Sequence, residues 1–112
     1  MRVLVVLIAL AGCRAKQEGA SCPSVAGRYF AIARDELAAA KPPDDLRREV
    51  ADQLPAMRDT LQQACEDGAW SAAVRDCMVH AADHVALQAC ERDLTADQQR
   101  GLDRAARGEA TP

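Results

Sequence analysis

Four cysteines in this 112-residue sequence have a spacing that indicates which chemistry their thiols can perform. They are Cys22, Cys65, Cys77 and Cys90. The two shortest intervals between them hold 11 and 12 residues, which is too wide for a Cys-x-x-Cys redox pair or a zinc-finger pair. An even number of thiols in a small chain outside the cytosol instead predicts two disulfides, with buried free thiols as the alternative.

Two histidines offer a second kind of chemistry. His80 and His84 are four positions apart in a segment that we expect to be helical, and one helix face could present both imidazoles to a metal. Asp76 is the nearest candidate for a third ligand. Because two ligands do not form a tight site, a partly exposed, uncoordinated pair is the favoured interpretation. We therefore expect no metal and no other cofactor.

The remaining polar residues do not form a recognisable catalytic arrangement. Ser21, Ser24 and Ser71 are the only serines, and none lies on a glycine elbow. Acidic residues mostly stand beside arginines, as is typical of solvated helix faces. The sequence therefore predicts a protein that is not an enzyme.

The charge pattern also limits the partners. The chain has 14 basic and 17 acidic residues, giving a formal net charge of −3, and the two signs are interspersed. A basic patch for nucleic acid and a polybasic stripe for lipid headgroups are both missing from the sequence. We expect no nucleic-acid partner.

The first thirteen residues form a segment of different character. Arg2 precedes an apolar run over residues 3–10, and small residues then lead to Cys13. This order is typical of a secretory signal, and the run is too short to span a bilayer as a stable helix. Residues 10–13 read Leu-Ala-Gly-Cys, which resembles the bacterial lipobox at all four positions. The resemblance implies cleavage after Gly12 and lipidation of Cys13.

This resemblance implies how the chain is organised and where in the cell the protein is located. It implies a signal peptide over residues 1–12 and a lipidated cysteine with a tether over residues 13–21. A helical domain over residues 22–107 and a flexible tail over residues 108–112 complete the expected organisation. Arg14 follows the lipidated cysteine where an aspartate, by resemblance to inner-membrane lipoproteins, would imply retention. We expect attachment to the outer membrane through the lipid, with the domain facing the periplasm.

Apolar spacing of three and four residues predicts an all-α domain of about four to five helices. Ser24 begins the first, which Pro42 and Pro43 end, and Asp44 or Asp45 caps the second. The expected helices cover residues 24–40, 44–66, 71–84, 85–92 and 95–107.

Two boundaries stay open at this point. Pro55 either kinks the second helix or breaks it, and the continuous apolar stripe across this proline favours a kink. The third and fourth helices lack a proline or glycine between them, so a single helix over residues 71–94 is the alternative to a break near His84.

The helix map suggests how the cysteines pair. Cys22 precedes the first helix and Cys65 ends the second, so an antiparallel hairpin would bring them together. Cys77 and Cys90 would then join the third and fourth helices. A straight helix would hold these two about 20 Å apart, beyond the reach of a disulfide, so this pairing requires the break near His84.

Residues 94–98 read Leu-Thr-Ala-Asp-Gln, which matches the LTxxQ motif of a family of small periplasmic helical chaperones and stress sensors. Thr95 and Gln98 also fit a helix capping box, which is the favoured interpretation. The chain departs from that family in having four further cysteines and only one such motif.

The segment from residue 65 to residue 102 is similar to short cysteine-stapled lipoproteins predicted in deltaproteobacteria, notably myxobacteria. The similarity is carried by Cys65, Trp70, Ser71, Cys77, Cys90, Leu94, Thr95, Gln98 and Leu102. It implies no particular activity.

Together these features predict a lipid-anchored helical module that binds a protein or another envelope component. The alternative is a periplasmic chaperone or a metal-responsive stress sensor, motivated by the LTxxQ motif and the two histidines. Trp70 would suit an interface if exposed, although a place in the core is the favoured interpretation.

Overall fold

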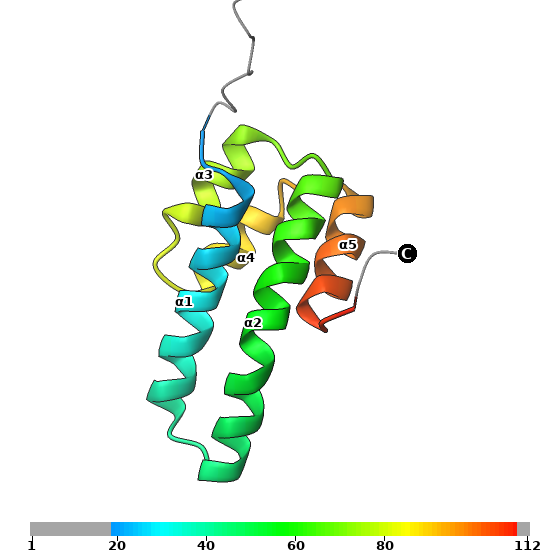
Figure 1. Cartoon of the computed structure of the whole chain (residues 1–112). Helices are drawn as coiled ribbons and strands as arrows, with labels where there is room; N and C mark the ends of the chain where they lie inside the picture. Colours follow the sequence, from blue (N-terminus) through cyan, green and yellow to red (C-terminus); the bar gives the residue numbers. More distant parts are fainter. Residues whose placement is uncertain (1–18, 110–112) are drawn as a thin grey trace, which may run out of the picture.

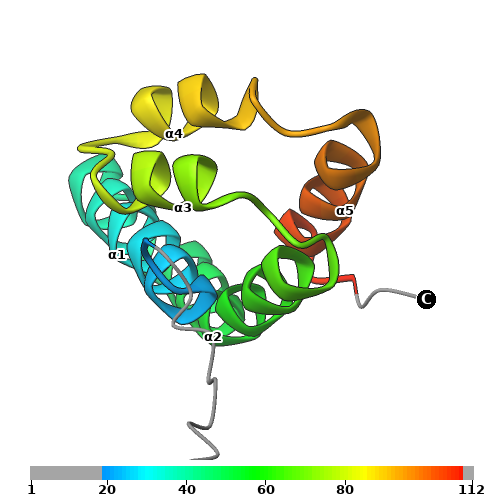
Figure 2. The same ribbon diagram turned by 90° about the horizontal axis from the view of Figure 1, so that it is seen from above.

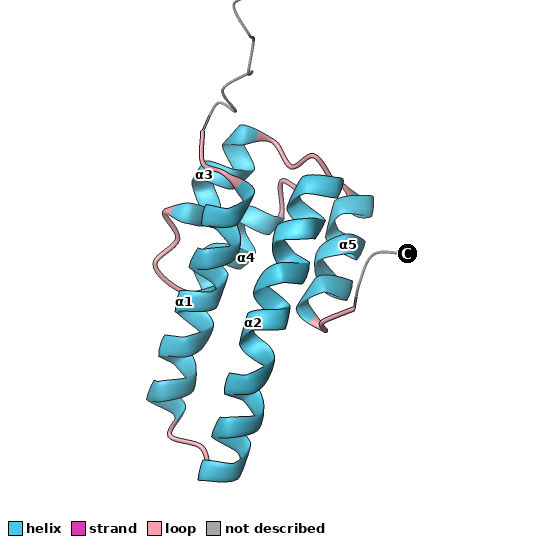
Figure 3. Cartoon of the chain, viewed as in Figure 1, coloured by secondary structure: helices cyan, strands magenta, loops and turns pink. Residues whose placement is uncertain are grey.

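Five helices form the part of the chain that the structure, a computed structural model, describes, residues 19–109 (Figure 1, Figure 3). No strand occurs in this range. The predicted all-α class is therefore confirmed. The helices are α1 (Cys22–Ala40), α2 (Asp44–Asp67), α3 (Ala72–Val79), α4 (His84–Glu91) and α5 (Ala96–Ala106).

The two long helices α1 and α2 form an antiparallel hairpin (Figure 1). The side chain of Ser21 caps α1 by accepting a hydrogen bond from the backbone N–H of Ser24, so the helix begins before Ser24, where we predicted its start. It ends at Ala40, and Lys41, whose φ of 46° is left-handed, caps it immediately before two prolines. The predicted stop is confirmed.

Helix α2 passes through Pro55 without interruption, so the predicted alternative of two separate pieces is wrong. The predicted side-chain cap is also wrong. Pro43 occupies the N-cap position, whereas Asp44 and Asp45 lie in the first turn without a capping hydrogen bond. Their carboxylates still lie near the positive end of the helix dipole.

The chain does break between α3 and α4, and the single helix over residues 71–94 is excluded. The break comes earlier than predicted, because α3 ends at Val79 rather than near His84. Asp83 explains the restart, since its carboxylate accepts a hydrogen bond of 2.8 Å from the Ala86 N–H and caps α4. The intervening loop is held to α1 by Arg28, whose Nε donates to the Ala81 carbonyl at 2.7 Å.

Both predicted disulfides are present. Cys22–Cys65 joins α1 to α2 with a Cα–Cα distance of 5.7 Å, and Cys77–Cys90 joins α3 to α4 with a distance of 5.8 Å. By the loop-entropy relation the longer and shorter loops contribute about 4 and about 3 kcal/mol to stability. Cys22, Cys65 and Cys90 are buried, whereas Cys77 is exposed.

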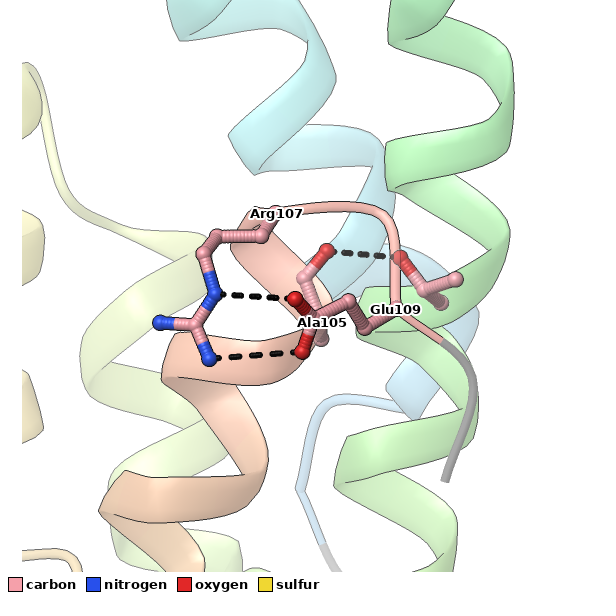
Figure 4. A network of polar contacts seen from close by, with 4 residues as sticks. Ala105, Arg107 and Glu109 are labelled. Carbon is pink, nitrogen blue, oxygen red and sulfur yellow. Dashed lines mark hydrogen bonds and ion pairs between the residues drawn. The ribbon is translucent and has the colours of Figure 1, made fainter. Parts of the chain in front are cut away.

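The short helices pack on different parts of the hairpin. Helix α4 contacts α1 and α3, whereas α5 contacts α2 (Figure 2). The Thr60 hydroxyl of α2 donates to the Ala105 carbonyl at 2.7 Å and fixes the end of α5 on α2. Just beyond that carbonyl, Arg107 and Glu109 form an exposed ion pair (Figure 4). The chain thus places α4 against α1 and α5 against α2, on the same side of the hairpin (Figure 2).

Candidate functional site

A cleft of about 370 Å³ lies where α1, α2, α4 and α5 meet. Its apolar lining comes from all four helices. The largest apolar side chains in it are Ile32, Met57, Leu61, Leu87 and Leu102. All of these except Met57 are at most 5% exposed. The floor of the cleft is therefore also the wall of the core, and its shape is fixed by core packing.

The polar lining of the cleft is acidic. Glu36 of α1, Glu91 of α4 and Asp103 of α5 contribute carboxylates, and no lysine or arginine of residues 19–109 lines the space. His84 and Gln88 complete the polar set, with the His84 Nε2 and the Gln88 Nε2 3.2 Å apart. The three carboxylates outnumber the one imidazole, so the net charge of the cleft is negative.

Tyr29 links the apolar and acidic parts of the cleft. Its hydroxyl donates a hydrogen bond of 2.8 Å to Oε1 of Glu91. Burial raises the pKa of the Tyr29 phenol well above its ordinary value, and the hydrogen bond to Glu91 and the negative charge of that carboxylate raise the pKa further. The phenol thus stays protonated and holds one carboxylate in place.

A second arrangement, which we call the grip, consists of hydrogen bonds from Arg75 and to Asp76 that hold Ala20 just before α1. Arg75 is only 8% exposed, and its guanidinium donates to the Trp70 carbonyl at 3.1 Å and to the Ala20 carbonyl at 2.5 Å. The neighbouring Asp76 carboxylate accepts a hydrogen bond of 2.6 Å from the Ala20 N–H. Both backbone polar groups of Ala20 are therefore bound to α3.

Gly19 is adapted to this grip. Its φ of +82° is in the left-handed region, and a Cβ built on it would lie 2.8 Å from the Asp76 carboxylate oxygens. Residues 19–21, which the sequence assigned to a tether, thus belong to the folded body. Arg75 was not predicted from the sequence, although an arginine beside the apolar positions 74 and 78 is a signal of this role.

The candidate metal ligands do not form the expected pair. His80 is the C-cap of α3 and His84 is the first residue of α4, so the premise that both lie on one helix face is wrong. The His80 Nδ1 lies 2.7 Å from the Asp76 carbonyl, and the Asp76 side chain binds Ala20. Within residues 19–109, no group of three or more His, Cys, Asp or Glu side chains is placed to hold a metal ion.

The LTxxQ segment has a structural role. Thr95 and Gln98 form the predicted capping box of α5, with both reciprocal hydrogen bonds present. The Gln98 amide also donates to the Gly68 carbonyl at 2.8 Å, which ties the start of α5 to the end of α2. Trp70, at 3% exposure, lies in the core as favoured.

The segment with the lipobox resemblance, including Cys13, lies outside the described residues, as do residues 110–112 of the tail. None of the helices between residues 19 and 109 combines the length and the apolar character needed to cross a bilayer. No protein-family model, curated protein or solved structure matches this chain.

Proposed function

We propose that the protein is a lipid-anchored helical module of the bacterial cell envelope that binds another protein and performs no catalysis. Cys13 would carry the lipid at the outer membrane, and the domain would face the periplasm. The anchor is supported by the lipobox resemblance of residues 10–13, and the grip of Arg75 and Asp76 on Ala20 indicates how an anchored domain would be oriented.

Because it limits the free length of the N-terminal segment, the grip would set how an anchored domain is held at the membrane. Five residues, 14–18, separate Cys13 from Gly19. Fully extended, this stretch spans about 20 Å, so a lipid on Cys13 would hold the α3 end of the bundle close to the membrane. The loop between α1 and α2 lies at the opposite end of the bundle (Figure 1) and would face away from the membrane.

The cleft supports binding as the activity. It combines an apolar floor with acidic groups from three helices, so a partner could contact apolar and charged groups at one place. The alternative of a chaperone or metal-responsive sensor has less support. Thr95 and Gln98 are engaged in capping α5, and His80 and His84 lie on different helices.

Metabolic labelling with an alkyne fatty acid tests the anchor. We expect label on the wild-type protein, none on Cys13→Ala, and acylated Cys13 as the first residue by mass spectrometry. Cys77→Ala/Cys90→Ala is the matched control, because it removes two other cysteines, which form a disulfide, but should keep the label. An unprocessed chain with an unmodified Met1 in the membrane fraction would contradict the proposal.

Photo-crosslinking in the envelope tests protein binding. A photoreactive residue in place of Glu36 lies at the cleft, whereas one in place of Gln63 lies on an exposed part of α2 away from it. We expect a discrete protein adduct from position 36 only. Equal adducts from both positions, or none from either, would argue against a partner at the cleft.

A further inference from the structure

We propose that the cleft between α1, α2, α4 and α5 is a binding site for a small organic ammonium ion that carries an apolar body. This inference goes beyond the binding of a protein partner. It depends on the geometry of the cleft and needs neither the lipid anchor nor the partner.

The size of the cleft favours a small molecule. Its volume of about 370 Å³ lies at the lower end of the range of about 300–1,000 Å³ that is typical of small-molecule pockets. Ile32, Leu61, Leu87 and Leu102 are core residues, so the apolar floor exists before any ligand arrives. An apolar body bound there requires little reorganisation of the protein.

The charge of the lining favours a cation over an anion. Glu36, Glu91 and Asp103 come from three different helices and face one space. None of them forms an ion pair with a base within residues 19–109. Arg107 exerts a Coulombic attraction on Asp103, but it does not line the cleft.

The hydrogen-bonding capacity of the lining also favours a cationic ligand that donates hydrogen bonds. The Tyr29 hydroxyl already donates to Glu91, and the Gln88 amide lies against His84. What remains for a ligand is mainly carboxylate oxygens, which only accept. An ammonium group supplies three donors and a positive charge, whereas a carboxylate or phosphate ligand would be repelled.

Three probes with one apolar body and different charges test the proposal: 2-phenylethylammonium, 2-phenylethanol and 3-phenylpropanoate. Each is titrated into the full chain in zwitterionic nanodiscs, and binding is followed by amide chemical shifts. We expect the ammonium to bind most tightly, the alcohol more weakly and the carboxylate weakest. The shifts should lie around Ile32, Leu87 and Leu102.

Variants separate specific binding from general attraction to an acidic protein. Glu36→Gln and Asp103→Asn should each weaken ammonium binding about two- to fivefold, as expected for partly solvated charge pairs. Asp59→Asn, on exposed α2 outside the cleft, should leave the affinity unchanged. Ala33→Leu narrows the cleft and should weaken the ammonium and the alcohol alike.

Three results would overturn the proposal. One is equal affinity for the ammonium and the carboxylate, and another is a loss in Asp59→Asn as large as in Asp103→Asn. The third is a shift pattern outside the cleft. Since Glu36→Gln and Asp103→Asn change exposed side chains, their result does not depend on Ala33→Leu folding. Absence of a crosslinked protein would contradict the proposed function while leaving this test unaffected.

Discussion

Raising the pH above 10 should destabilise this protein through one side chain, Tyr29. The phenol is buried against the carboxylate of Glu91, and both burial and that contact raise its pKa in the folded state. In the unfolded chain the phenol titrates near its ordinary value of about 10. The contribution of Tyr29 is therefore fully present below pH 10 and declines above it, because only the unfolded chain then releases the proton.

The magnitude follows from proton linkage. While the folded phenol stays protonated, the free energy of unfolding should fall by about 1.4 kcal/mol for each pH unit above 10. Tyr29→Phe removes this slope. At neutral pH the same substitution should cost about 1–2 kcal/mol, since it removes a hydrogen bond to a charged acceptor. The two chains should thus become nearly equal in stability close to pH 11.

Urea unfolding at pH 8, 10 and 11 measures this, with the fluorescence of buried Trp70 as the probe. Tyr29 is the only tyrosine, so the near-ultraviolet absorbance of phenolate reports its ionisation directly. A folded chain that forms phenolate with a midpoint near pH 10 would refute the reasoning. An identical loss of stability in the wild type and in Tyr29→Phe would refute it equally.

Three further predictions concern stability and the grip on the N-terminal segment. Gly27→Ala should stabilise the protein by about 0.5–1 kcal/mol in urea unfolding, because an added Cβ meets no atom of the described residues within 4 Å. Gly68→Ala should destabilise the protein, because the added Cβ would lie 2.8 Å from a backbone carbonyl oxygen. The Cys77–Cys90 disulfide between α3 and α4 should be reduced before the Cys22–Cys65 disulfide, because Cys77 is exposed while both Cys22 and Cys65 are buried. Treatment with limiting reductant, followed by alkylation and peptide mapping, measures the order, and the opposite order would contradict this prediction. Asp76→Ala should accelerate hydrogen exchange of the Ala20 amide, which loses its acceptor, and unchanged exchange would show that the grip is not formed in solution.

The features that depend on short stretches of chain could be predicted from the sequence. Apolar spacing and prolines locate the helices, and the order of the helices then determines which cysteines meet. The end of α3 was less predictable, because the apolar pattern continues through Ala81 while Asp83 caps the next helix. The apolar spacing favours a longer α3, whereas the Asp83 cap favours a new helix after it, and local sequence alone does not determine where α3 ends.

The cleft could not be predicted for a different reason. Glu36, Glu91 and Asp103 lie far apart in the chain, and they share one space only because α4 packs on α1 while α5 packs on α2. The prediction that His80 and His84 share one helix face is wrong for the opposite reason, since the two residues are close in sequence but separated by a helix break. Local spacing predicts elements better than it predicts sites formed by several elements.

The Cys22–Cys65 bridge has a mechanical consequence. The N-terminal segment enters the fold at Gly19, three residues before Cys22, which is bonded covalently to the far end of α2. Tension applied through that segment therefore passes from α1 into α2 through a covalent bond. Pulling cannot peel α1 from the hairpin turn by turn from its N-terminus, so the cleft walls built from both helices keep their spacing under tension.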